Sequence, residues 1–227
     1  MRLWGILVRW VSCFGEFVCA RQFLHGEVLV AMKIYGDSGS GNCLKLKYVA
    51  DYLGLAYQWI AVDILQGESR TPQFLAKSPQ GQVPIIELDD GRCLAQSNAI
   101  LGYLSQDSAL DPGDAFLRAK VQELLFWEQY SHEPYIAVCR FRMHYLGEPK
   151  SAREPWRVER GEQALDLMDR MLKADGWMVG DDITIADIAL LAYTRLAHEG
   201  GFELASRKHV ANWVGRCEAT LGLPSAG

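Results

Sequence analysis

The dipeptide Val83-Pro84 limits the possible folds of this chain more than any other feature of the sequence. Proline has no backbone N–H, so at the start of a strand it indicates an edge or a special bend of a sheet. A cis peptide bond is accessible only before proline, where it lies about 0.5–1 kcal/mol above trans. The strand-like run Ile85–Leu88 follows, and the chain then turns at Asp89-Asp90-Gly91. We therefore predict a β-hairpin that begins at this dipeptide.

Short strands and helices alternate around the hairpin, over residues 32–106. Hydrophobic spacing together with glycine and proline stops predicts strands at Lys33–Tyr35 and Tyr57–Ile64, and helices at Cys43–Leu53, after Thr71-Pro72 and at Ser97–Ser105. The hairpin would pair Val83–Leu88 with Arg92–Leu94. Two βα units followed by a hairpin and a helix predict an α/β domain, in which helices cover the faces of a four-stranded mixed sheet.

The second half of the chain has a helical pattern throughout. Residues 107–114 are polar and contain Pro112-Gly113, which predicts a linker. Apolar spacing then predicts four helices, at Ala115–Arg140 with a bend near Pro134, and at Glu154–Ala174, Asp187–His198 and Lys208–Leu221. We therefore expect residues 115–227 to form an all-helical domain behind the α/β domain.

The first 31 residues do not match this pattern. Arg9 and Glu16 interrupt the apolar core that a secretory signal requires. The segment is also too charged to span a bilayer, which takes about 20 apolar residues. We interpret residues 1–31 as an extension outside the fold that results from a start codon placed too early. A membrane or partner anchor is the alternative interpretation.

Charge and cysteine content exclude several classes of function. The net charge of −5 gives no electrostatic reason to expect nucleic acid or an anionic membrane as a partner. The six cysteines are scattered, without a C-x-x-C pair or zinc spacing, so we predict no metal site. A chain of 227 residues can build its core without disulfides, which indicates reduced thiols and a cytoplasmic location.

The segment Ser40-Gly41-Asn42-Cys43 stands at the start of the first predicted helix, where thioredoxin-like redox proteins have C-x-x-C. Serine in the first position excludes dithiol exchange through that pair. A hydroxyl and unpaired N–H groups at the positive end of a helix would instead stabilise a thiolate brought by a ligand. Two alternatives remain: Ser40 is a plain N-cap, or Cys43 is a redox cysteine rather than a core residue.

Two further segments could contact such a ligand. If the Val83-Pro84 bond is cis, the backbone N–H and C=O of Val83 face outward and can pair with an extended peptide. Gln96-Ser97 stands at a helix N-terminus, where N–H groups and a hydroxyl favour a carboxylate. An ordinary hairpin strand and an ordinary helix cap are the alternatives. The order of the three features is similar to that of a thioredoxin-like domain that holds a peptide thiol.

The chain resembles the cytosolic glutathione S-transferase superfamily, in its serine-type, bacterial-like form. The matching segments are Met32-Lys33-Ile34-Tyr35-Gly36, Ser40-Gly41-Asn42-Cys43, Ser78-Pro79-Gln80-Gly81-Gln82-Val83-Pro84, Gln96-Ser97-Asn98-Ala99-Ile100 and residues 179–187. The resemblance covers residues 32 to about 221 and does not specify the substrate. It implies a detoxifying homodimeric enzyme that needs no cofactor, uses glutathione as co-substrate, and acts on small hydrophobic electrophiles or peroxides.

The resemblance also assigns roles to individual residues. Ser40 matches the serine that activates the glutathione thiol in the serine-type classes. The implied glutathione-binding residues are Asn42, Gln82, Val83, Pro84, Gln96 and Ser97. Among them, Val83 matches the residue whose main chain pairs with the cysteinyl unit, ahead of a cis-proline, while Gln96 and Ser97 match the pair that holds the γ-glutamyl end.

Two positions depart from the family pattern. The position of Gln82 is often lysine or arginine, and that of Gln96 is commonly a glutamate that pairs with the ligand's α-amino group. Glutamine provides no charge at either position, so we expect modest affinity for glutathione. Arg70 or a second subunit could compensate.

In the helical half, Thr184-Ile185-Ala186-Asp187 predicts a capping box, with Ile183 packed on Ile188 as a hydrophobic staple. We interpret this motif as structural. The long helix has an aromatic stripe, which we interpret as core or dimer contact with a part facing the cleft between the domains: Phe126, Trp127, Tyr130, Tyr135, Phe141 and Tyr145. The neighbouring Glu128, His132 and Glu133 are predicted to form a solvated face.

Other functions remain open at this point. A non-enzymatic docking module of the same fold would neither bind glutathione nor use it. A thiol-disulfide oxidoreductase would depend on Cys43 instead of Ser40. A dedicated glutathione-dependent dehalogenase or isomerase would use the same thiolate on one substrate.

Overall fold

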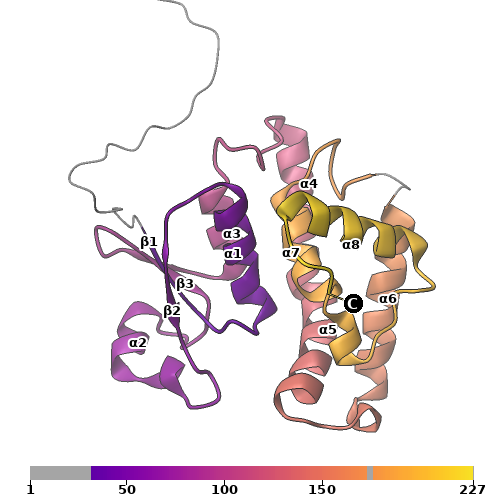
Figure 1. The fold of residues 1–227 in the computed structure, drawn as a ribbon, viewed down its shortest axis with the longest axis horizontal. Helices are drawn as coiled ribbons and strands as arrows, with labels where there is room; N and C mark the ends of the chain where they lie inside the picture. The colour runs from indigo at the N-terminus through magenta and orange to yellow at the C-terminus, as the bar shows by residue number, and fades with distance from the viewer. Residues whose placement is uncertain (1–31, 173–175, 227) are drawn as a thin grey trace, which may run out of the picture.

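The computed structural model describes residues 32–172 and 176–226. The predicted extension, residues 1–31, lies outside the described residues. In Figure 1 the first half of the chain, from indigo to magenta, forms a sheet with helices, and the second half is a group of helices beside it. Helices α1 and α3 lie between the sheet and the helical half, where both pack against α7.

The sheet has the predicted four strands: β1 (Met32–Gly36), β2 (Gln58–Ala61), β3 (Ile85–Leu88) and β4 (Cys93–Ala95). Their order is β2-β1-β3-β4. Strand β1 is parallel to β2 and antiparallel to β3, and β3 is antiparallel to β4. The prediction of a four-stranded mixed sheet is therefore confirmed.

The helices of this half are α1 (Gly41–Tyr52), α2 (Pro72–Lys77) and α3 (Ser97–Leu104). Strand β2 is shorter than the predicted Tyr57–Ile64. The chain leaves the sheet early because the Asp63 carboxylate accepts hydrogen bonds from the N–H groups of Leu65 and Gln66, which form a turn. A 3₁₀ helix, η1 (Glu68–Arg70), follows this turn and precedes α2.

One long helical path begins the second half. It consists of α4 (Ala115–Trp127), η2 (Glu128–His132), α5 (Glu133–Arg140) and η3 (Phe141–Tyr145). The η2 and η3 turns are π-helical, and η2 directly precedes Pro134. Proline lacks the N–H of a regular helical turn and its ring clashes with the preceding turn, so a wider turn is expected before it. The predicted irregularity near Pro134 takes this form.

The remaining elements are η4 (Lys150–Ala152), α6 (Pro155–Met171), α7 (Ile185–Thr194), η5 (Ala197–Gly200) and α8 (Lys208–Leu221). Helix α8 has the predicted bounds. Helix α7 begins two residues before the predicted start and ends at Thr194, short of the predicted His198, and the short 3₁₀ helix η5 follows it. None of the helices in the described part of the chain is long and apolar enough to cross a membrane.

The predicted capping box at the start of α7 is confirmed. The Thr184 hydroxyl accepts a hydrogen bond from Ala186 N–H, and the Asp187 carboxylate accepts one from Thr184 N–H at 2.9 Å. Ile183 and Ile188 are both buried in the same cluster, as a staple requires. Asp187 is completely buried and also accepts from the indole N–H of Trp213 at 2.9 Å. This carboxylate therefore joins α7 to α8 in addition to capping its own helix.

A shared core holds the two halves together. One cluster of buried residues includes Val49 of α1 and Leu101 of α3 together with Ile188 and Ala189 of α7. Such burial is the main source of stability at an interface of this kind. The cleft between the halves is consequently formed by packed elements from both sides.

Candidate active site

A cavity of about 550 Å³ opens beside the sheet, between the two halves of the chain. Its size falls in the usual range for ligand sites. All seven predicted site residues line it: Ser40, Asn42, Gln82, Val83, Pro84, Gln96 and Ser97. The structure therefore brings together residues from three separate parts of the first half.

Ser40 occupies the N-cap position of α1, with an extended backbone conformation. Its hydroxyl makes no capping hydrogen bond, so the alternative of a plain N-cap does not describe its side chain. The next residue must be glycine because a Cβ at Gly41 would lie 2.7 Å from the ring of Tyr193. The start of α1 therefore packs closely against Tyr193, which belongs to the helical half.

Tyr193 is a residue near this site that the sequence analysis did not identify. It lies on α7, 151 residues from its partner, and its hydroxyl accepts a hydrogen bond from Asn42 N–H at 3.3 Å. The expectation that the N–H groups at this helix start are unpaired is therefore wrong for Asn42. Burial raises the pKa of Tyr193, as does the Glu133 charge, while hydrogen bonds with Asn42 and Ser40 lower it. The phenol stays protonated near neutral pH.

The loop between β1 and α1 is also held from the helical half. Arg140 donates to the carbonyl of Gly39 at 2.7 Å, and the Tyr145 hydroxyl donates to the Asp37 carboxylate at 2.8 Å. Arg140 is in turn paired with Glu199 at 2.5 Å. A second, small cavity of about 50 Å³ lies beside these groups, lined by Ser40, Ile64, Ala137, Arg140, Phe141, Tyr145 and Tyr193.

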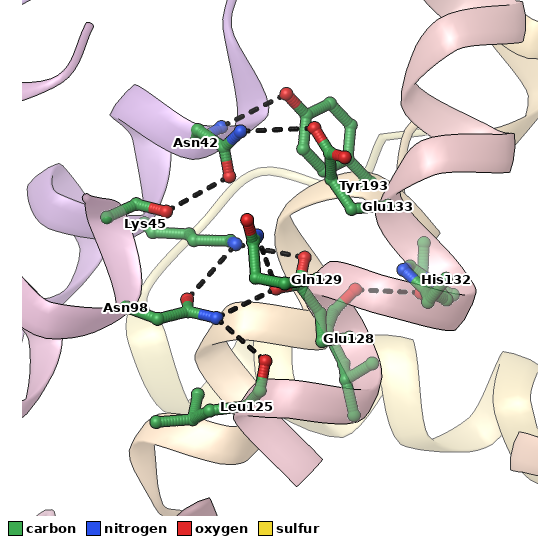
Figure 2. Close-up of polar contacts among 12 residues, drawn as sticks. Asn42, Lys45, Asn98, Leu125, Glu128, Gln129, His132, Glu133 and Tyr193 are labelled. Atoms are coloured by element: carbon green, nitrogen blue, oxygen red, sulfur yellow. Dashed lines mark hydrogen bonds and ion pairs between the residues drawn. The ribbon is translucent and has the colours of Figure 1, made fainter. Parts of the chain in front are cut away.

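Asn42 links the two walls of the large cavity, as Figure 2 shows. Its side-chain amide donates to the Glu133 carboxylate at 3.2 Å, and its carbonyl oxygen accepts from the Ser97 hydroxyl at 3.1 Å. Burial and the nearby Glu128 charge raise the pKa of Glu133. A single side chain thus connects the start of α1, the start of α3 and the helical half.

The Val83–Pro84 peptide bond is cis. The pairing of β3 with its neighbours begins at Ile85, opposite Tyr35 and Ala95, so Val83 precedes the ladder. Val83 itself is one of the residues that line the large cavity.

Gln96 has an unusual backbone, with a φ of 70° at a residue that is not glycine. Such conformations persist where the surroundings enforce them, often at binding sites. Its side-chain amide donates to the Gln80 side chain at 2.8 Å, and Arg70 donates to the carbonyl of Gln80 at 3.0 Å. Arg70 also lines the cavity, together with the uncharged Gln82.

The prediction of a solvated face at Glu128, His132 and Glu133 is wrong. Glu128 and His132 are completely buried, and Glu133 is partly buried against the cavity. Glu128 pairs with Lys45 of α1, also completely buried, at 2.9 Å. The same carboxylate accepts from Asn98 of α3 at 2.9 Å (Figure 2). Glu128 is therefore buried against α1 and α3, where Lys45 and Asn98 are its partners, and does not face solvent.

His132 has one bonded and one unbonded ring nitrogen. Thr194 donates its own hydroxyl hydrogen to Leu190 at 2.7 Å, so Nε2 of His132 donates to the Thr194 oxygen at 2.9 Å. Nδ1 is buried without a hydrogen-bond partner among the described residues. Burial lowers the pKa of His132 to about 4, against a smaller opposite effect of the Glu128 charge. The imidazole is neutral near pH 7.

Cys43 is completely buried in α1, as predicted for a core residue. Burial raises the pKa of its thiol to about 12, although a hydrogen bond with Ser40 acts in the opposite direction. A thiol in this state is a poor nucleophile. Among the described residues there is also no group of histidine, cysteine and acidic side chains that could hold a metal ion.

The chain combines a thioredoxin-like half, which contains a cis-proline, with a helical half, and a polar cavity lies between them. Residues 30–106 match the family model of the glutathione S-transferase N-terminal domain, and residues 132–220 match that of its C-terminal domain. The chain belongs to the cytosolic glutathione S-transferase superfamily, and its enzyme class is glutathione S-transferase.

Individual relatives agree with this assignment. A crystal structure of a glutathione S-transferase from Pseudomonas fluorescens Pf-5 is 48% identical, with a TM-score of 0.80, over 83% of this chain and 95% of the other. Glutathione S-transferase 3 of Zea mays is 29% identical over 82% of this chain and 88% of its own length. Maleylacetoacetate isomerase of Pseudomonas aeruginosa is 28% identical over 76% of this chain and 84% of its own length.

Proposed function

We propose that the protein binds glutathione in the large cavity and ionises its thiol, and that the thiolate attacks a small hydrophobic electrophile or a peroxide. One observation carries this proposal: the seven residues that the family pattern assigns to catalysis and glutathione binding line a single cavity. In the proposed complex, Ser40 faces the sulfur, the Val83 backbone pairs with the cysteinyl unit, and Gln96 and Ser97 hold the γ-glutamyl end.

The energy needed to ionise the thiol is modest. A free thiol with a pKa of about 8.5 is only a few per cent ionised near neutral pH. Lowering that pKa to about 6.5 takes roughly 2.7 kcal/mol, at 1.36 kcal/mol per unit. One charge-assisted hydrogen bond from Ser40 together with the positive end of α1 can supply an amount of this order.

The electrophile would lie next to the sulfur, on the side of the helical half. Ile64, Leu65 and Phe141 provide apolar surface in the large cavity, and Phe141 also borders the small cavity beside Ser40. The adjoining cavity of about 50 Å³ leaves little room, which supports a small co-substrate.

Two variants test the mechanism directly. We expect Ser40→Ala to lower kcat/KM with glutathione and a generic electrophile by about 10- to 100-fold at pH 7, because it removes one hydrogen bond to the developing thiolate. Cys43→Ala should retain most of the activity. If only the cysteine variant loses activity, the protein is instead a cysteine-dependent oxidoreductase. If the wild type neither binds immobilised glutathione nor turns over any electrophile, it is a docking module.

The isomerase relative adds a second candidate reaction. Maleylacetoacetate isomerase is 28% identical to this chain, and reversible addition of the same thiolate to a conjugated double bond would isomerise such a substrate. A panel of chlorinated aromatics, peroxides, haloalkanes and maleylacetoacetate, each with glutathione, distinguishes the candidates. A preference of several orders of magnitude for one substrate would identify a dedicated metabolic enzyme, and broad activity would support detoxification.

We also propose a cytoplasmic homodimer. The scattered cysteines of the sequence support the location. Support for the dimer comes from Phe126 and Tyr130, one helical turn apart on the long helix and 72% and 81% exposed. Large exposed aromatic groups of this kind favour an interface. Sedimentation of the wild type should give a dimer, and Tyr130→Asp should weaken it; a monomeric wild type would refute this part.

A further inference from the structure

The Tyr193 hydroxyl has two polar neighbours at the start of α1. It accepts a hydrogen bond from Asn42 N–H at 3.3 Å, and the Ser40 side chain is near enough to lower the pKa of the phenol. Both Ser40 and Tyr193 line the small cavity next to the large one. The absence of a side chain at Gly41 allows this approach, because a Cβ there would lie 2.7 Å from the tyrosine ring.

The donors and acceptors permit a chain of hydrogen bonds through these groups. A phenol has one hydrogen to donate, and the backbone N–H of Asn42 can only donate. Asn42 N–H therefore donates to the Tyr193 oxygen, and the Tyr193 hydrogen remains to be donated; Ser40, which lines the same small cavity, has an oxygen that can accept it. The Ser40 hydrogen remains for a third group. Hydrogen bonds in such a chain polarise one another, so each makes the next a better donor.

We infer that Tyr193 is a positioning residue, which holds the Ser40 hydroxyl as a donor to the sulfur of bound glutathione. The inference rests on the proposed function and extends it. The positive end of α1 acts on the sulfur through two hydroxyls in series, from Asn42 N–H to Tyr193 to Ser40, rather than only through N–H groups that face the ligand.

The proton balance is simple. The thiol of glutathione loses its proton to solvent when the ligand binds, and the sulfur keeps the electron pair. Ser40 and Tyr193 both keep their own protons, and no bond of the protein is broken. The charged or titratable groups around the two hydroxyls are Asp37, Cys43, Glu133, Arg140 and Tyr145. All five are present in each variant below, so a difference in thiol pKa between variants results from the loss of the Ser40 or Tyr193 hydroxyl.

Two measurements test the inference. The ultraviolet absorption of the thiolate gives the pKa of the bound glutathione thiol, and kinetics give the pH profile of kcat/KM. For Tyr193→Phe we expect about a fivefold loss of kcat/KM on the acidic side of the profile, the effect of one ordinary hydrogen bond. The loss should vanish at high pH, where the thiol is ionised in any case. KM for glutathione should change less than twofold.

Tyr48→Phe is the matched control. Tyr48 is a buried tyrosine of α1 whose hydroxyl accepts from Arg195 at 2.9 Å, away from Ser40. This variant loses a buried hydroxyl of the same kind, so it shows the effect of altered stability alone. We expect its thiolate titration to coincide with that of the wild type, and thermal melts of both variants to establish that they are folded.

The double variant Ser40→Ala/Tyr193→Phe decides whether the two hydroxyls act in series. If they do, the pKa of the bound thiol in the double variant equals that in Ser40→Ala alone. An equal further shift in the double variant would overturn the inference, because Tyr193 would then contact the sulfur independently. An unchanged thiol pKa in Tyr193→Phe would overturn it as well. If the wild type fails to ionise glutathione, the proposed function itself fails, and that outcome needs no variant to detect.

Discussion

Two neighbouring positions of α1, Asn42 and Lys45, belong to polar clusters of opposite character. Asn42 lies at the large cavity, between Ser97 and Glu133; Asn42 and Glu133 are partly open to solvent, and Ser97 is buried. Lys45 is completely buried one turn further along, bonded to Asn98 and Glu128. Both clusters connect the two halves of the chain. The first leaves polar groups available for a ligand, whereas the second satisfies its charges internally.

The difference shows how the cavity is kept in shape. Asn98 follows Ser97 directly in α3, and Lys45 follows Asn42 by three residues in α1. The buried cluster therefore fixes the two helices whose starts form the polar wall of the cavity. Removal of one partner from a buried pair leaves an uncompensated charge, while removal of a partner from an open site mainly weakens binding. The predictions below follow from this contrast, in order of expected effect.

Lys45→Met should produce the largest loss of stability. It leaves Glu128 charged and buried, so we expect the free energy of unfolding to fall by about 3–5 kcal/mol, measured by urea denaturation. The control on the same helix is Lys47→Met, whose partner Asp51 is about half exposed, and we expect a change below about 1 kcal/mol. The double variant Lys45→Met/Glu128→Leu should lose less stability than Lys45→Met alone, because it leaves no unpaired buried charge. If the free energy of unfolding of Lys45→Met fell by less than about 1 kcal/mol, the buried cluster would not stabilise the protein more than the cavity cluster does, and the comparison would fail.

Asp187→Ala should come next. A helix cap alone contributes about 1 kcal/mol. Asp187 is also the acceptor for Met178 N–H and the Trp213 indole, so its removal leaves buried donors unpaired. We therefore expect a loss of about 2–3 kcal/mol. Asp182→Ala, on the exposed turn before the cap, serves as the control. An Asp187→Ala protein that melts like the wild type but is inactive would show a catalytic role instead.

The stability should also depend on pH through His132. Its pKa in the folded protein is about 4, below the ordinary 6.5, so the unfolded chain takes up the proton first. The contribution of the neutral His132 to the free energy of unfolding is complete above about pH 6.5 and is lost as the pH falls toward 4. Between pH 7 and pH 5 we expect a loss of about 2 kcal/mol from this group.

His132→Gln tests this dependence because glutamine does not titrate. Its unfolding free energy should vary less between pH 7 and pH 5 than that of the wild type, by the amount expected for His132. His209→Gln, which changes a half-exposed histidine, should keep the wild-type dependence. If the unfolding free energy changed equally with pH in the wild type, His132→Gln and His209→Gln, His132 would not be a buried neutral residue.

Asn42→Ala should have the smallest effect on stability and a visible effect on binding. It removes the connection between Ser97 and Glu133 at the cavity wall. We expect KM for glutathione to rise about fivefold, the equivalent of one hydrogen bond, with a stability loss of about 1 kcal/mol or less. Isothermal titration with glutathione measures the affinity. A loss of stability as large as that of Lys45→Met would show that Asn42 acts like a member of the buried cluster around Lys45.

Local sequence chemistry was sufficient for most of the fold. Gly54 has the positive φ of a helix-terminating glycine, and Thr71, just before the predicted short helix, caps α2 by accepting from Phe74 N–H. These features depend on interactions within a few residues, so they can be predicted one segment at a time. The sequence left the isomer of the Val83-Pro84 bond open, and the structure shows that it is cis. Strand β2 was predicted too long because the Asp63 turn depends on one short side chain.

The sequence by itself determined the succession of strands and helices and the capping box at Thr184, since each depends on local spacing, and its resemblance to the family assigned the seven residues that line the cavity. Only the tertiary structure decided that Glu128 and His132 are buried and that Tyr193 reaches Ser40 and Asn42. The physical reason is that a helical pattern specifies which residues share a face but not which helix covers that face. Leu124 and Leu125 of the long helical path share a core cluster with residues of α1 and α3, and α7 packs against α1, so groups more than 80 residues apart become hydrogen-bonded neighbours.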